Sequence, residues 1–162
     1  ATAGSPITES NCHPFQWGNY LWQHNGMISG FFAIRRRLLA ALSDPLFDLV
    51  QGNTDSEHLG LLYLHILFSK VAEPSNDASN DEFSVPPDLT NIEQRLKAPI
   101  PREHYEQAYS HDALCRAMVM TLAIVVQWTK EAGIEMFSLL NCAVTDGKSV
   151  IVSRYVNDEK YD

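Results

Sequence analysis

The sequence lacks several patterns that would reveal a common chemistry. Its three cysteines, Cys12, Cys115 and Cys142, form no Cys-x-x-Cys pair and no metal-ligand spacing. Its six histidines include no His-x-His or His-x-x-x-His pair, so we predict no metal centre. There is no Gly-x-Ser-x-Gly nucleophile elbow and no glycine-rich phosphate loop, so we predict no serine hydrolase of that type and no cofactor.

Positive charge and long apolar runs are also scarce. Twelve Lys and Arg face 20 Asp and Glu, and the net charge of −8 argues against a nucleic-acid partner. The basic run Arg35–Arg37 is predicted to be a solvated helix face. The longest apolar run, 113–128, is too short to span a membrane and contains Arg116, so no membrane partner is expected. An odd number of cysteines favours reduced thiols and a cytoplasmic setting.

The start of the chain lacks the charged and apolar regions of a secretory signal. It also lacks an initiator Met, so we expect a processed product or a fragment of a longer protein. Its 162 residues suffice for one domain with a sizeable core.

The spacing of hydrophobic residues, together with turn-forming and capping residues, predicts the helices and strands of the first half of the chain. We expect loops over 1–19, a short buried strand over 20–23 and an amphipathic helix over 31–42. A second helix begins at Thr54, where Glu57 completes a capping box, and it is apolar nearly all round, so it should be buried.

The second half of the chain predicts a polar segment, a long helix and a β-hairpin. Residues 72–101 are polar and rich in proline, which is typical of a surface excursion or a disordered insertion. A long helix is expected over about 102–132, ended by Gly133. Apolar runs on both sides of Asp146-Gly147 predict a β-hairpin. Helices between antiparallel sheet elements indicate an α+β domain.

Two local features admit more than one interpretation. Asn25-Gly26 follows the short strand, so it fits a strand-to-helix turn, but it could also offer a side-chain amide and a backbone N–H to an oxygen that becomes negative. The adjacent Cys12 and His13 suggest a catalytic dyad, although neighbours in a loop stiffened by Pro14 seldom point at each other. We favour a structural loop there.

Four short motifs occur in a specific order: ATAG at 1–4, NCHP at 11–14, HNG at 24–26 and TDSE at 54–57. In these motifs the chain resembles the class II glutamine amidotransferases, a branch of the N-terminal-nucleophile hydrolases. It is most similar to the subgroup that includes the fungal glutathione-degrading complex and the amidohydrolase of ergothioneine synthesis. The resemblance implies a four-layer αββα sandwich, incomplete in this chain, with 1–162 forming part of one such domain.

The resemblance also implies roles for four residues. The Asn25 side-chain amide and the Gly26 backbone N–H would form an oxyanion hole. Thr2 would help to bind the α-carboxylate of the substrate, and Asp55 would bind its α-ammonium. Asp55 also fits a second interpretation, an acid at a helix start that is stabilised by the helix dipole.

Two groups that the resemblance requires are missing from the chain. The family nucleophile is an N-terminal cysteine, whereas Cys12 fills the variable position of the second motif, and the arginine that clamps the carboxylate belongs two residues before Ala1. We therefore expect the parent protein to cleave a γ-glutamyl amide and this chain alone to be inactive. A partner subunit with a peptidase role is implied as well. The alternatives are a non-catalytic pseudoenzyme or partner subunit, and a glutaminase domain that feeds ammonia to a synthase.

Overall fold

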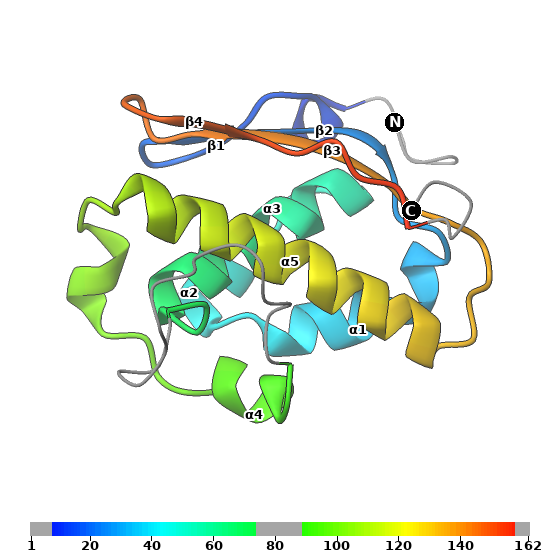
Figure 1. Cartoon of the computed structure of the whole chain (residues 1–162). Coiled ribbons are helices and arrows are strands. Elements are labelled where there is room, and N and C mark those ends of the chain that lie inside the picture. The colour runs from blue at the N-terminus through cyan, green and yellow to red at the C-terminus, as the bar shows by residue number, and fades with distance from the viewer. Residues whose placement is uncertain (1–7, 74–88, 158–162) are drawn as a thin grey trace.

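The computed structural model describes residues 8–73 and 89–157 of the chain. One antiparallel sheet lies on one side and the helices cover one of its faces (Figure 1). The strand order follows the chain and consists of β1 Phe15–Trp17, β2 Tyr20–Met27, β3 Leu139–Thr145 and β4 Val150–Val152. This arrangement confirms the predicted α+β class.

The helices form the rest of the fold. They are α1 Phe31–Ala41, α2 Asp44–Phe47, α3 Asp55–Ser69, α4 Ile92–Leu96 and α5 His111–Glu131, with short 3-10 turns η1 Glu9–Asn11 and η2 Arg102–Tyr105. Helix α3 packs against β2, α1 and α5, and every residue from Asp55 to Phe68 is buried. The predicted buried helix is therefore confirmed, and it is the centre of the core.

Helix α5 is long and apolar enough to cross a membrane, judged by length and composition. It packs, however, against α3, α1 and β4, and its apolar stripe from Leu114 to Trp128 is buried in the same core as α3. We therefore assign α5 to the protein core.

Strand β2 differs most from the sequence prediction. It extends from Tyr20 through Asn25 and Gly26 to Met27, so Asn25-Gly26 is paired with β3 and is not a turn. The turn into α1 comes later, at Gly30, whose φ of 64° suits glycine. The predicted loop over 1–19 also contains β1, which pairs with β2 through a tight turn at Gly18.

Two helix boundaries also differ. The expected helix over 102–132 begins only at His111, where the Ser110 side chain accepts a hydrogen bond from Ala113 N at 3.2 Å. The insertion predicted over 72–101 lies partly outside the described residues, but its last part contains α4. Ile92 and Leu96 of α4 are buried in the core, so this part is not a surface excursion.

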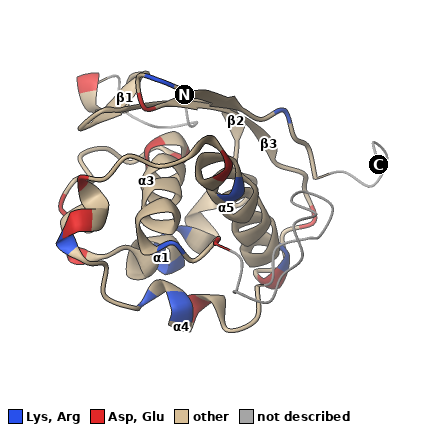
Figure 2. Cartoon of the chain, turned by 60° about the vertical axis from the view of Figure 1, so that its left-hand side comes forward, with Lys and Arg blue, Asp and Glu red and all other residues tan. Residues whose placement is uncertain are grey.

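The outer face of the sheet carries no charged residue and exposes several apolar side chains beside polar ones such as Gln23 and Asn25. The four strands contain no Lys, Arg, Asp or Glu, whereas the helices carry charges of both signs (Figure 2). Leu21, Met27, Val150 and Val152 are exposed on the strands, up to 71% for Val152. The described sheet and helices form two layers, and exposed apolar side chains on a sheet face are typical of a surface that packs against another element.

Candidate active site

The second, third and fourth motifs meet in space at the end of β2. The Asn11 side-chain oxygen accepts a hydrogen bond from Asn53 N at 3.2 Å, which joins the second motif to the loop before α3. His13 Nε2 accepts a bond from His24 N at 3.4 Å, which joins the second motif to the third. Segments up to 42 residues apart in the sequence therefore meet at one edge of the sheet.

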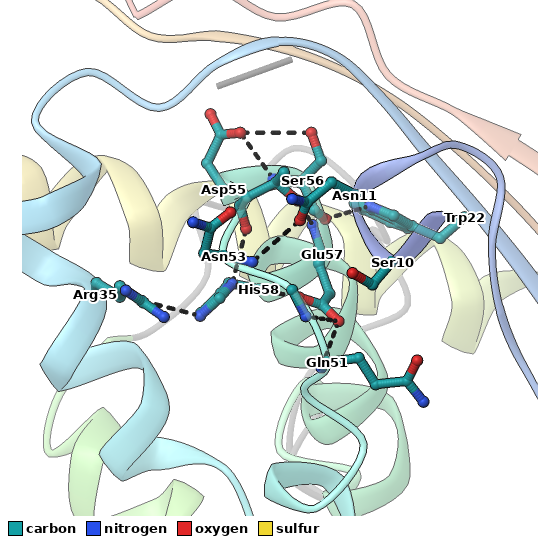
Figure 3. Close-up of polar contacts among 12 residues, drawn as sticks. Ser10, Asn11, Trp22, Arg35, Gln51, Asn53, Asp55, Ser56, Glu57 and His58 are labelled. Carbon is teal, nitrogen blue, oxygen red and sulfur yellow. Dashed lines mark hydrogen bonds and ion pairs between the residues drawn. The ribbon is translucent and has the colours of Figure 1, made fainter. Parts of the chain in front are cut away.

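The start of α3 is held by its own side chains (Figure 3). Thr54 Oγ1 accepts from Glu57 N at 3.2 Å, as the capping box predicts. The Glu57 carboxylate does not return to Thr54, because it accepts from Gln51 N at 2.8 Å and Gly52 N at 2.9 Å. Burial raises the pKa of Glu57, and these backbone donors oppose that rise. The loop before α3 is thus fixed by a buried carboxylate.

Asp55 connects α3 to the end of β2. Its side chain is 2% exposed, its Oδ2 accepts from Ile28 N at 2.9 Å, and its Oδ1 accepts from Ser56 N at 2.8 Å. Asp55 occupies the first turn of the helix, so the dipole stabilises it as the second interpretation requires. The bond to Ile28, two residues after Gly26, shows that the carboxylate also lies beside the predicted donors.

The register of the sheet fixes the direction of the Gly26 N–H. In an antiparallel ladder, the N–H and C=O of one residue point to the same neighbouring strand, and successive residues alternate. Leu140, opposite Gly26, donates its N–H to Tyr155 O at 2.8 Å and accepts from Ser153 Oγ at 2.9 Å, both on the β4 side. The pair formed by Gly26 and Leu140 therefore exchanges no bonds, and the Gly26 N–H points to the opposite edge of β2.

That edge is open at Gly26. Phe15, the first residue of β1, pairs with Trp22. After Trp22, β1 no longer pairs with β2, and the N–H groups that β2 directs to this edge meet side chains instead. The His24 N–H is taken by His13 and the Ile28 N–H by Asp55. Gly26 lies between them, and within residues 8–73 and 89–157 no acceptor bonds to its N–H.

Asn25 and Gly26 present their groups in different directions. The Asn25 side chain is exposed on the outer face of the sheet, while its backbone oxygen accepts from Asn141 Nδ2 at 2.9 Å. A Cβ added to Gly26 would lie 1.9 Å from Leu139 O, so only glycine fits this approach of β3. The Gly26 N–H thus lies in the plane of the sheet, whereas the Asn25 side chain lies on its outer face, and their shared role as oxyanion donors stays a prediction.

The described cysteines offer weak nucleophiles or none at this edge. Cys142 pairs with His24 across β2 and β3, and burial raises the pKa of its thiol to about 12. Cys12 is exposed and donates to Thr8 O at 3.3 Å, while Cys115 lies on α5. Among the described residues no three His, Cys, Asp or Glu side chains gather as metal ligands would.

The candidate site does not coincide with the cavity beside β1. Thr2 falls outside the described residues, so its predicted role stays a prediction. A cavity of about 730 Å³ opens beside β1 and is lined by Trp17, Tyr20 and Tyr105 among others, but not by Asn25, Gly26 or Asp55. The candidate site is an open strand edge and not this cavity.

The sequence analysis considered His13 only as a partner of Cys12 and gave no role to His24 or Ser56, although all three belong to the quoted motifs. Their membership of those motifs was the available signal. What it could not reveal is that His13 bonds to β2, and that His24 and Ser56 bond to each other across 32 residues of sequence.

Comparisons with known proteins give two similar proteins. No protein-family model matches the chain. The chain is similar to the probable glutamine amidotransferase DUG3 of Saccharomyces cerevisiae, at 34% identity over 157 residues, which is 94% of this chain and 36% of that protein. It is also similar to the solved structure of a glutamine aminotransferase class-II domain protein from Silicibacter pomeroyi, with a TM-score of 0.53, 28% identity and coverage of 92% of this chain and 50% of that one. The chain thus spans about a third of the curated relative and half of the solved one.

Proposed function

Because this chain belongs to the class II glutamine amidotransferase family, we propose that it forms part of an enzyme that hydrolyses γ-glutamyl amides. The observation that carries the proposal is the Gly26 N–H on the β2 edge, which has no acceptor among the described residues and lies between the N–H groups bonded by His13 and Asp55.

The Asn25 amide and the Gly26 N–H act as the oxyanion hole. When a thiolate attacks the γ-carbonyl carbon, the carbonyl oxygen becomes negative, and donors that are already in place stabilise it without reorganisation. A strand paired on its other side to β3 is a rigid support for such donors.

Asp55 accepts the α-ammonium of the substrate. Its carboxylate lies at the end of β2, where it accepts a hydrogen bond from Ile28 N at 2.9 Å, and a carboxylate attracts the positive charge of an ammonium group. Thr2 contributes to the α-carboxylate pocket together with an arginine from outside this chain.

The reaction proceeds through a thioester. A cysteine thiolate from outside this chain attacks the γ-carbonyl carbon, the C–N bond breaks, and the leaving nitrogen takes a proton to depart as ammonia or an amine. Water then attacks the γ-glutamyl thioester, which releases glutamate and regenerates the thiol. Cys142 does not take this part, because its thiol is buried and its pKa is raised to about 12.

The substrate class is the γ-glutamyl unit, which glutamine and glutathione share. Contacts to its α-ammonium and α-carboxylate do not distinguish the two, so the leaving group is selected by residues elsewhere. A role in glutathione catabolism, with a peptidase partner subunit in the cytoplasm, follows from the subgroup that the motifs resemble.

The first test compares Asn25→Ala with Gln23→Ala in the full-length protein. Gln23 is exposed on the same strand and face, two residues before Asn25, so it is a matched control. Loss of one oxyanion donor should lower kcat about 100- to 1,000-fold, with an unchanged melting temperature. Release of glutamate from glutamine and glutathione gives the rates. Equal kcat for Asn25→Ala and wild type would contradict the oxyanion role, and an inactive wild type would favour a pseudoenzyme.

The second test replaces Asp55 with asparagine, which keeps the shape but removes the charge. We expect KM for γ-glutamyl substrates to rise about tenfold or more while kcat changes less, because a hydrogen bond between charged groups is lost. An unchanged KM would remove Asp55 from the substrate site.

A further inference from the structure

His24 holds β2 against β3 immediately before the proposed oxyanion donors. Its side chain is 3% exposed and both ring nitrogens are engaged, with Nε2 2.9 Å from Leu139 O and Nδ1 3.1 Å from Ser56 Oγ. A carbonyl oxygen only accepts, so Nε2 carries a proton. His24 thereby fixes the Leu139 carbonyl, which is the group that approaches Gly26 most closely.

Ser56 extends this contact to Asp55. Its Oγ lies 3.1 Å from His24 Nδ1 and 3.4 Å from Asp55 Oδ1, and its backbone N–H donates to the same Asp55 oxygen at 2.8 Å. The Ser56 carbonyl also accepts from Trp22 Nε1 at 2.9 Å, so a second β2 side chain holds this residue (Figure 3). Ser56 is 6% exposed, so water does not readily replace these bonds.

These contacts form one buried connection from β3 through His24 and Ser56 to Asp55. The Asn25-Gly26 dipeptide lies at one end of this connection, and the Asp55 carboxylate, proposed to accept the substrate ammonium, lies at the other. An active site needs both ends at a fixed separation, since a shift of about 1 Å can cost roughly a hundredfold in rate. The connection spans the two elements, β2 and α3, that carry these ends.

We propose that His24 and Ser56 are positioning residues that set the Asp55 carboxylate relative to the oxyanion donors, and so make the enzyme selective for substrates with an α-ammonium. The inference rests on the proposed function. It predicts that removing the Ser56 hydroxyl lowers kcat/KM only for substrates whose α-ammonium Asp55 can bind. The kcat/KM of an amide without the α-amino group should stay unchanged.

The test compares L-glutamine with glutaramate, which has the same γ-amide and carboxylate but no α-amino group. In the full-length protein, Ser56→Ala should lower the ratio of kcat/KM for glutamine to kcat/KM for glutaramate by about tenfold, chiefly through KM for glutamine. Ser56→Thr retains the hydroxyl and should retain the ratio. Thr121→Ala removes another buried hydroxyl, on α5, and should leave the ratio unchanged.

Ser56→Cys is a second variant for the case that Ser56→Ala does not fold. It keeps the shape of the side chain and replaces the hydroxyl with a thiol, which is a weak donor. It should lose selectivity as the alanine variant does. A selectivity ratio that stays at the wild-type value in a folded Ser56→Ala or Ser56→Cys variant would overturn this inference alone. A wild-type protein that hydrolyses neither amide would overturn the proposed function, and the inference with it.

Discussion

Replacing Gly26 with alanine should destabilise the protein through one identifiable clash. The new Cβ would lie 1.9 Å from Leu139 O and 2.7 Å from the Leu139 carbonyl carbon, far inside any van der Waals contact. The carbonyl cannot move freely, because His24 Nε2 bonds to it at 2.9 Å. Overpacking of this kind costs about 1–3 kcal/mol. For a protein of this size each kcal/mol lowers the melting temperature by about 2–4 °C, so we expect a fall of about 2–12 °C.

Calorimetry or thermal circular dichroism measures this fall, with Gln23→Ala as the control on the same strand. The control should melt within about 1–2 °C of the wild type, because exposed substitutions usually change stability by less than about 0.5 kcal/mol. In the full-length enzyme, Gly26→Ala should also lower kcat, since the displaced N–H no longer meets the oxyanion. A Gly26→Ala protein that melts with the wild type would refute the close approach of β3 to Gly26.

Two further predictions concern stability. Burial lowers the pKa of His65 to about 4 in the folded protein. Between pH 6.5 and about 4 the unfolded chain therefore binds more protons than the folded protein. The free energy of unfolding should fall by up to about 3 kcal/mol as the pH drops through this range. Urea titrations across this range should show a shallower dependence for His65→Gln, and an equal slope would contradict it. Arg37 pairs with Glu93 and Glu131 and lies 4.9 Å from the Trp128 ring, so Arg37→Ala should cost about 1 kcal/mol. The exposed neighbour variant Arg36→Ala should cost little, and equal urea midpoints for the two would argue against this cluster.

The helices could be predicted because their signals are local. Phe31, Ile34 and Leu38 repeat at helical spacing and are buried on α1, and the Thr54 cap begins α3 as expected. The basic run on α1 was predicted less well. Arg35 donates to His58 and Arg37 to two carboxylates, so the run is not simply a solvated face.

Asn25-Gly26 shows what local signals miss. The dipeptide is typical of a turn, but β3, more than a hundred residues later, pairs with it and keeps it extended. Similarly, β1 has only three residues in a segment rich in proline and glycine, and its pairing with β2 makes it a strand. The order of the motifs pointed to segments 11–14, 24–26 and 54–57, which side-chain hydrogen bonds connect at the end of β2. The direction of the Gly26 N–H depends instead on sheet register, which no single motif encodes.

The motifs also explain why the site forms at one edge. Asn11, His13 and Asp55 each bond to a backbone N–H of another segment, so the loops are joined to the strand by side chains. Two of these bonds occupy the N–H groups on both sides of Gly26, whose own N–H meets no acceptor in the part of the chain that the structure describes.

The most direct measurement is a structure of the full-length protein with a γ-glutamyl aldehyde bound, in which the aldehyde carbon takes the tetrahedral form. We expect the resulting oxygen to lie within about 2.7–3.1 Å of both Gly26 N and Asn25 Nδ2, and the ligand ammonium to contact Asp55. An oxygen bound away from the β2 edge, with the Asn25 amide directed elsewhere, would contradict this expectation.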